Sequence, residues 1–384
     1  MVELDLYLGT IAQIQGQPEV AQRLLLKVAR DPSASPATAL AMRARLVTML
    51  HEVLPGTEEA ISESRAVLGA DLQRLILELN SRPSHEERTM LLHPDKKLGI
   101  TAFKLAHQGQ NDLELMGLWG ELVMALAPVV LSSSPSMATK ISRPTEGSAP
   151  SRTKLRVGFV SSYLVEQHSI GNMMLQHVRG LGALEDMDVH VFVPGGSSTL
   201  DTEGHLTGKL NVVQAYMAST ADVHLLPKDL GALREAIAEQ ELDVLVYTDI
   251  GMDPITYYLS FARLAPVQCA WWGHPSTTGS PAIDYFISLD DEVPEGEEHY
   301  GEQLVRFAAM ETAPFHQFSP VAVEDRPSLE GRHSVSHYDR ATRRCLIALH
   351  AALYIQHPSP HGCIPHTYPP VHAEEIKATL KLNS

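Results

Sequence analysis

The stretch LDVLVYTDIGMDPITYYLSFARLAPVQCAWW, residues 242–272, decides the fold class. It opens and closes on short apolar runs, LDVLVYTDI and APVQCAWW, whose length and composition predict two buried strands. Between them, PITYYLSFARLA predicts a helix over residues 254–265. Strands that are apolar throughout and are joined by a helix are typical of a parallel sheet with both faces covered.

The same alternation continues on both sides of this stretch. A strand, a helix, a second strand and a second helix are predicted upstream, and two further strands downstream. The sequence therefore predicts an α/β unit, one Rossmann-like lobe spanning residues 154–310. Its other predicted elements are strands over 155–162, 188–194, 284–290 and 303–307 and helices over 172–184 and 228–240.

Three further segments flank or precede this lobe. Residues 1–131 are predicted to be helical, and the helix pair on either side of Gly16-Gln17-Pro18 is similar to one tetratricopeptide (TPR) unit. A plain helical hairpin is the alternative, because no second copy follows about 34 residues later. Residues 132–153 are rich in Ser, Thr, Pro and Gly, which predicts a linker. Residues 311–384 are predicted to be an irregular Pro- and His-rich tail.

Charge and composition exclude several functional classes. The chain has 384 residues and a formal net charge of −16. This charge disfavours nucleic acid and anionic membranes as partners, since proteins that bind them carry basic faces. Residues 115–131 are apolar but contain Glu121 and are too short to span a bilayer, so they predict a buried helix. With three cysteines and no secretory signal, the expected location is cytoplasmic or nuclear.

The tail offers one candidate metal site, formed by His357, His361 and Cys363. Pro358 and Pro360 break the helix that would place the two histidines on one face. An irregular tail is therefore the favoured interpretation of this segment, and no metal is predicted.

Three unusual loops follow strands of the predicted sheet. The first carries His168, the second is TDIGMDP with Asp249 and Met252, and the third is GHPSTTGS, residues 273–280. Ligands of open parallel sheets bind beyond the carboxyl ends of the strands, so the three loops predict one site. Small residues let a ligand approach the backbone, and hydroxyl groups can donate hydrogen bonds to it.

Each of these residues has more than one interpretation. His168 could act as a general base, as a hydrogen-bond donor to a leaving phosphate, or in a structural role only. Asp249 is either part of the site or a cap of the following helix. No GxGxxG, P-loop or GxSxG motif occurs, which disfavours a dinucleotide site of the usual kind and two common catalytic sites.

These motifs, taken in order, resemble the O-GlcNAc transferase family. The resemblance is carried by LRVGFVSS, HSIGNMM, the segment from LDVLVY to FISLD with its APVQ and WGHPSTTG motifs, and EQLVRF. It covers about residues 154–307 and extends weakly to TAFKLAHQGQND, residues 101–112. The family includes SPINDLY-type protein O-fucosyltransferases and, more distantly, bacterial cytoplasmic N-glucosyltransferases.

The resemblance implies a GT-B fold with two Rossmann-like lobes, and transfer of a sugar from a nucleoside diphosphate to a protein with inversion and without a required metal. It implies that His168 lies beside the sugar and the acceptor as the catalytic residue. It also implies that the loop after residue 272 contacts the sugar. The residues of that loop that it assigns to substrate binding, with Asp249 and Met252, are Gly273, His274, Pro275, Thr277 and Thr278.

The donor sugar and the activity of the chain stay open at this point. Thr-Thr-Gly favours the O-GlcNAc and SPINDLY branches, whereas His274 and TDIGMDP favour the N-glucosyltransferase branch. UDP-GlcNAc is the expected donor, with UDP-glucose and GDP-fucose as alternatives, and Ser or Thr of acceptor proteins is the expected target. Because the strand–helix pattern ends after Met310, an apparently truncated chain with an incomplete second lobe is expected. A catalytically inactive fragment that binds other proteins is the alternative function.

Overall fold

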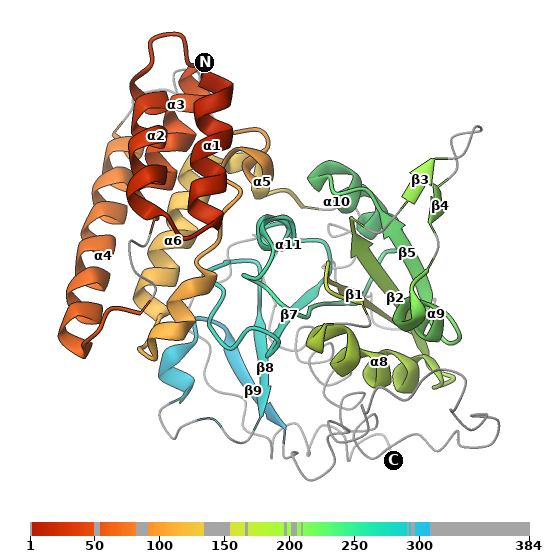
Figure 1. Cartoon of the computed structure of the whole chain (residues 1–384). Helices are drawn as coiled ribbons and strands as arrows, with labels where there is room; N and C mark the ends of the chain where they lie inside the picture. The colour runs from red at the N-terminus through yellow and green to blue at the C-terminus, as the bar shows by residue number, and fades with distance from the viewer. Residues whose placement is uncertain are drawn as a thin grey trace.

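The computed structural model describes residues 2–49, 54–81, 91–133, 154–165, 168–195, 198–200, 206–208, 210–289, 292 and 296–307. Within these ranges a helical region precedes a parallel sheet that is covered by helices (Figure 1). The predicted fold class, a helical region followed by one Rossmann-like lobe, is thereby confirmed. The predicted tail over 311–384, with its candidate metal ligands, lies outside the described residues, as does most of the predicted linker.

The helical region begins with a hairpin of α1 (Val2–Ile14) and α2 (Pro18–Arg30), joined at Gly16, which has a left-handed φ of +69°. Then come α3 (Pro36–Val47) and α4 (Glu58–Asn80), which both begin at a hydroxyl N-cap, Ser35 and Thr57. The region closes with α5 (Pro94–Lys97), η1 (Phe103–Gln108), α6 (Leu113–Leu126) and η2 (Pro128–Val130). Whether the first hairpin is a TPR unit stays a prediction.

The predicted buried helix over 115–131 is confirmed in α6, whose Trp119 and Leu122 are buried. None of the helices in the described residues has the length and apolar character needed to cross a membrane.

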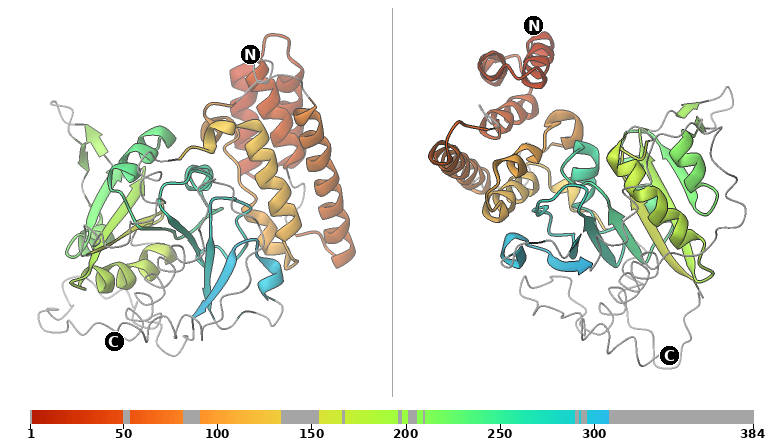
Figure 2. Two further views of the ribbon diagram at one scale, coloured as in Figure 1. Left: turned by 180° about the vertical axis from the view of Figure 1, so that it is seen from behind. Right: turned by 60° about the horizontal axis from the view of Figure 1, so that its bottom comes forward.

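The lobe is built on seven parallel strands in the order β5-β2-β1-β6-β7-β8-β9. Helices α8 and α9 pack on one face of the sheet, and α10 and α11 on the other (Figures 1 and 2). The strands are β1 (Leu155–Val160), β2 (Met187–Pro194), β5 (Asp222–Leu226), β6 (Val244–Tyr247), β7 (Val267–Trp271), β8 (Tyr285–Leu289) and β9 (Gln303–Phe307). The helices are α8 (Ser169–Gly182), α9 (Val212–Met217), α10 (Leu230–Glu239) and α11 (Pro254–Leu259), with η3 (Gly296–His299) before β9. A small hairpin of β3 (Ser198–Leu200) and β4 (Leu206–Gly208) lies between β2 and α9.

This strand order has a switch point between β1 and β6. From β1 the chain proceeds outward to β2 and β5, returns through α10 to β6, and then proceeds the other way to β9. Connections on the two sides of the switch point leave from opposite faces of the sheet. The loops that follow β1 and β6 therefore diverge there, which is where open α/β sheets bind ligands.

Several predicted elements differ from those observed. The predicted helix over 254–265 ends at Leu259, and Gln268 takes up the free carbonyl of Ala262 just beyond it. The predicted strand over 242–250 is shorter, because Thr248 begins the next loop. β5 was not predicted, because its sequence DVHLL carries Asp222 and His224 instead of a continuous apolar run. It is an edge strand of the sheet and only partly buried, so it needs no such run.

The helical region shares its core with one face of the sheet. A single cluster of buried side chains continues from Leu72 of α4 and Trp119 of α6 to Tyr258 of α11 and Phe286 of β8. Figure 2 shows that α6 lies beside β8 and β9, at the β9 edge of the sheet. Apolar burial of this kind holds the helices and the sheet together.

Candidate functional site

Three loops meet at the carboxyl edge of the sheet, as predicted. The loop after β1 leads to His168, the loop after β6 runs from Thr248 to Asp253, and the loop after β7 runs from Trp272 to Ser280. The structure joins the first two through Tyr163, whose hydroxyl donates to the carbonyl of Met252 at 3.1 Å. The predicted site residue Met252 therefore lies in the loop after β6, and its backbone carbonyl contacts the loop after β1.

His168 is the N-cap of α8. Its Nδ1 accepts a hydrogen bond from the backbone N–H of Ile170 at 3.2 Å, and its ring stacks on Tyr163 with centroids 4.5 Å apart. Partial burial lowers the pKa of the imidazole, so the ring is neutral at pH 7. Because Nδ1 accepts, the proton of the neutral ring sits on Nε2. The geometry thus equips His168 to donate a hydrogen bond from Nε2, and a proton taken up at Nδ1 would break the helix cap.

Asp249 is almost fully buried behind the same loops. Thr248 donates its hydroxyl to Asp249 Oδ1 at 2.9 Å, and Oδ2 is buried without a hydrogen-bond partner. Burial raises the pKa of this carboxyl to about 7, despite the hydrogen bond from Thr248, and the nearby Asp253 carboxylate acts in the same direction as burial. The N-cap position of α11 is held by Asp253, so Asp249 does not cap that helix.

Asp253 is a site residue that the sequence motifs did not single out. It is buried, and it accepts a hydrogen bond from the Ser162 hydroxyl and pairs with Lys228 Nζ at 2.9 Å. These contacts tie the loop after β1 and the segment just before α10 to the loop after β6. Asp253 is the second acidic residue of TDIGMDP, and this was the signal in the sequence that could have identified it. An Asp directly before a helix is, however, also the usual pattern of a helix N-cap.

Gly273 and His274 pack the loop after β7 against the loop after β6. A Cβ added to Gly273 would lie 2.1 Å from the carbonyl oxygen of Thr248, so only glycine fits there. The ring of His274 covers Gly251 and packs on Phe103 in a tilted arrangement, with centroids 4.8 Å apart and ring planes at 35°. Burial, with His107 nearby, lowers the pKa of His274 to about 4, so this ring is neutral. Pro275 is exposed at the tip of the turn.

Thr277 and Thr278 are buried and bonded to one carboxylate. Glu302, just before β9, accepts the Thr277 hydroxyl at 2.7 Å and the Thr278 backbone N–H at 2.8 Å, and it also accepts the Thr278 hydroxyl. The Thr277 hydroxyl in turn accepts the backbone N–H of Gly301. Both hydroxyls thus hold the loop in shape, and their predicted contact with substrate stays a prediction.

The rest of this loop rests on the helical region. The Ser276 hydroxyl donates to Asp112 Oδ2 at 3.1 Å, and the other oxygen of Asp112 pairs with buried Arg65 at 2.8 Å. Gly279, with φ +66°, lies so close to α6 that an added Cβ would be 2.0 Å from the carbonyl oxygen of Met116. The small and hydroxylated residues after β7 are therefore explained in large part by close packing and internal hydrogen bonds.

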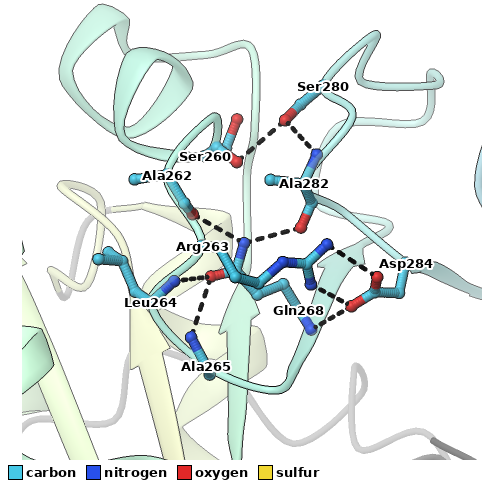
Figure 3. Close-up of polar contacts among 9 residues, drawn as sticks. All are labelled: Ser260, Ala262, Arg263, Leu264, Ala265, Gln268, Ser280, Ala282 and Asp284. Atoms are coloured by element: carbon cyan, nitrogen blue, oxygen red, sulfur yellow. Dashed lines mark hydrogen bonds and ion pairs between the residues drawn. The ribbon is translucent and has the colours of Figure 1, made fainter. Parts of the chain in front are cut away.

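A polar network fixes the base of the same loop (Figure 3). The buried side chain of Gln268 accepts from the backbone of Leu264 and donates to the carbonyl of Ala282 at 2.7 Å. Arg263 pairs with Asp284 through two hydrogen bonds, at 2.7 and 3.0 Å, and Asp284 also accepts the Gln268 backbone N–H. These contacts explain the Arg, Gln and Asp of FARLAPVQ and DYFISLD, which sequence reasoning had used only as family markers.

Comparisons with known proteins match part of this chain. It is 36% identical over 104 residues to UDP-glucose:protein N-beta-glucosyltransferase of Actinobacillus pleuropneumoniae serotype 5b, covering 26% of this chain and 17% of that protein. It is 27% identical over 155 residues to a probable UDP-N-acetylglucosamine–peptide N-acetylglucosaminyltransferase SEC of Arabidopsis thaliana, covering 40% of this chain and 14% of that protein. The chain therefore spans less than a fifth of the length of these curated relatives.

No family model matches the chain. Among solved structures, a mutant O-GlcNAc transferase of Thermobaculum terrenum aligns with 80% of this chain and 57% of its own, at 19% identity and a TM-score of 0.31. Over the matched part of its length, this chain is related to glycosyltransferases that act on proteins, the N-glucosyltransferase and O-GlcNAc transferase group.

Proposed function

We propose that the chain is a nucleotide-sugar-dependent protein glycosyltransferase that transfers GlcNAc from UDP-GlcNAc to Ser or Thr of acceptor proteins. The observation that carries the proposal is the placement of His168, at a helix N-terminus beside the switch point of a parallel sheet. A helix N-terminus favours negative charge, and the switch point is where such sheets bind nucleotides. The sequence relatives, which act on proteins, support the same activity.

The geometry of His168 favours one of its two predicted chemical roles, the hydrogen-bond donor over the general base. Its Nδ1 is used by the Ile170 N–H, so its Nε2–H is the group that would face a ligand. A hydrogen bond from Nε2 to an oxygen of the departing diphosphate would stabilise the charge that develops there. The raised pKa of Asp249 keeps that carboxyl partly protonated at neutral pH, which limits its repulsion of an anionic donor.

The test begins with calorimetric titration of the chain with UDP-GlcNAc, UDP-glucose and GDP-fucose. Micromolar binding of one of them would support the proposal and identify the donor. Transfer of a labelled sugar to acceptor protein would then be measured for His168→Ala, with the exposed His93→Ala as the matched control. We expect at least a hundredfold loss for His168→Ala and none for the control.

The pH dependence of transfer separates the two roles of His168. A general base loses about tenfold in rate per pH unit below its pKa, whereas a donor keeps its Nε2–H when Nδ1 is protonated and loses only the hydrogen bond from the Ile170 N–H. A rate that is flat below pH 6 would support the donor. If a folded chain binds none of the three sugar nucleotides, the alternative of a protein-binding module without activity is favoured.

A further inference from the structure

A second cluster of polar side chains lies away from the loops of the proposed site. Asp188 and His190 project from β2, and Asp222 and His224 from the neighbouring edge strand β5. Ligand atoms of Asp188, His190 and Asp222 all lie within 4.8 Å of one another. Because Asp188 is the second residue of β2 and Asp222 the first of β5, the cluster lies toward the amino ends of the strands, whereas His168 and Asp249 follow the carboxyl ends of β1 and β6.

The two ring nitrogens of His190 lie near different side chains. Nδ1 lies 3.2 Å from His224 Nε2 and 4.0 Å from Asp222 Oδ2, and Nε2 lies 3.6 Å from Asp188 Oδ1. His190 is only 4% exposed, and its Nε2 is buried without a hydrogen-bond partner. A buried imidazole N–H without an acceptor is costly, so the Nε2 proton is best directed at Asp188 Oδ1, and Nδ1 is then free to act as an acceptor or a metal ligand.

We propose that His190 Nδ1, His224 Nε2 and Asp222 Oδ2 bind a divalent transition-metal ion, with Zn²⁺ as the best fit, and that Asp188 orients His190. Two nitrogen ligands on tetrahedral zinc lie about 3.3 Å apart, given Zn–N bonds of about 2.0–2.1 Å. The two histidine nitrogens already have this spacing. A histidine ligand commonly donates its other N–H to a carboxylate, which is the position of Asp188.

The surroundings fit a cation. Arg156 Nε holds Asp188 Oδ2 at 3.1 Å, which leaves Oδ1 for His190. The side chain of Asp222 is 74% exposed, so it can rotate to close the remaining distance. Bound there, the ion would join the edge strand to its neighbour.

The test is calorimetric titration of the full chain with ZnCl₂ at pH 7.5. We expect one site whose affinity falls at least tenfold in Asp222→Asn and is lost in His224→Gln. Asp188→Asn should weaken it about 10- to 100-fold, as changes behind a metal ligand do. Asp222 is exposed enough that Asp222→Asn should fold normally, which far-UV circular dichroism checks.

Two controls make the outcome decisive. The exposed His93→Gln, and a double variant His357→Ala/His361→Ala in the tail, should bind Zn²⁺ as the parent chain does. Hydrogen exchange should slow at residues 222–226 when Zn²⁺ is added. No binding by the folded chain, or binding lost in the tail variant and kept in Asp222→Asn and His224→Gln, would overturn the proposal.

Discussion

The loop after β7 and the loops after β1 and β6 use polar side chains in opposite ways. After β7, Ser276, Thr277 and Thr278 all donate to carboxylates within the protein. After β6, by contrast, Asp249 keeps a buried oxygen without a partner, and its pKa is raised to about 7. Satisfied groups hold a shape, and unsatisfied ones with shifted pKa values mark candidate chemistry. The hydroxyl groups of the more conspicuous motif are thus engaged in internal hydrogen bonds, whereas the loop after β6 holds the buried carboxyl with the shifted pKa.

Removing the carboxylate under the β7 loop should have the largest effect on stability. Glu302→Ala leaves two buried hydroxyls and one backbone N–H without their acceptor, and we expect a loss of about 4 kcal/mol in the free energy of unfolding. Urea unfolding measures it. The exposed Glu298→Ala is the matched control and should change stability by less than about 0.5 kcal/mol. Equal midpoints for the two variants would show that the loop does not depend on this carboxylate.

Asp249 should make stability fall as pH rises. Its folded-state pKa, about 7, lies above the ordinary value of 3.8, so the folded chain binds a proton that the unfolded chain has already lost between these values. The free energy of unfolding should therefore decline from about pH 4 to pH 7, by about 3 kcal/mol. Asp249→Asn should remove this decline and be the more stable protein at pH 8, which urea unfolding across pH would detect. A parallel pH profile for parent and variant would place the pKa of Asp249 in its ordinary range.

Gly273 lies where the loop after β7 packs against the loop after β6, and this position should tolerate no side chain. Gly273→Ala sets a Cβ against the Thr248 carbonyl oxygen and the Ile170 side chain, and we expect a loss of about 2 kcal/mol. Gly117→Ala on α6, where a Cβ meets nothing within 4 Å, should instead stabilise by roughly 0.5–1 kcal/mol. Thermal unfolding of the pair gives the comparison. If Gly273→Ala matched Gly117→Ala, the loops after β6 and β7 would be free to separate.

The smallest effect on stability is expected at His168. His168→Ala removes an N-cap contact to Ile170, which is worth about 1 kcal/mol. His168→Asn should restore the cap and the stability without restoring an imidazole donor. Urea unfolding together with the transfer assay separates the two contributions. A variant that lost activity only in proportion to its stability would reduce His168 to a structural residue.

The sheet was predictable wherever its strands are buried on both sides. Val244–Tyr247 is a continuous apolar run and Val267–Trp271 is apolar apart from Gln268, because both faces of the sheet are covered. The edge strand Asp222–Leu226 was missed, since partial exposure permits polar residues there.

The candidate site was predictable in its location and less so in its contacts. Parallel strands bring the three loops to one edge whatever their sequence, so placing His168 and Asp249 there required only the topology. The partners of Thr277 and Thr278 could not be read from the chain. Glu302 lies 24 residues beyond Thr278, and a single acidic residue before a strand forms no pattern. Contacts between residues so far apart are set by packing, which local sequence does not report.

The contact between Gly279 and α6 also has a consequence for how the protein unfolds. Backbone meets backbone there, since a Cβ on Gly120 would lie 1.9 Å from the Gly279 carbonyl oxygen. The helical region cannot separate from the sheet without disrupting the loop after β7, which is held by hydrogen bonds to Glu302 and Asp112. Helical region and sheet should consequently melt in one cooperative transition, and neither should be exchangeable for a homologous segment unless both glycines are exchanged with it.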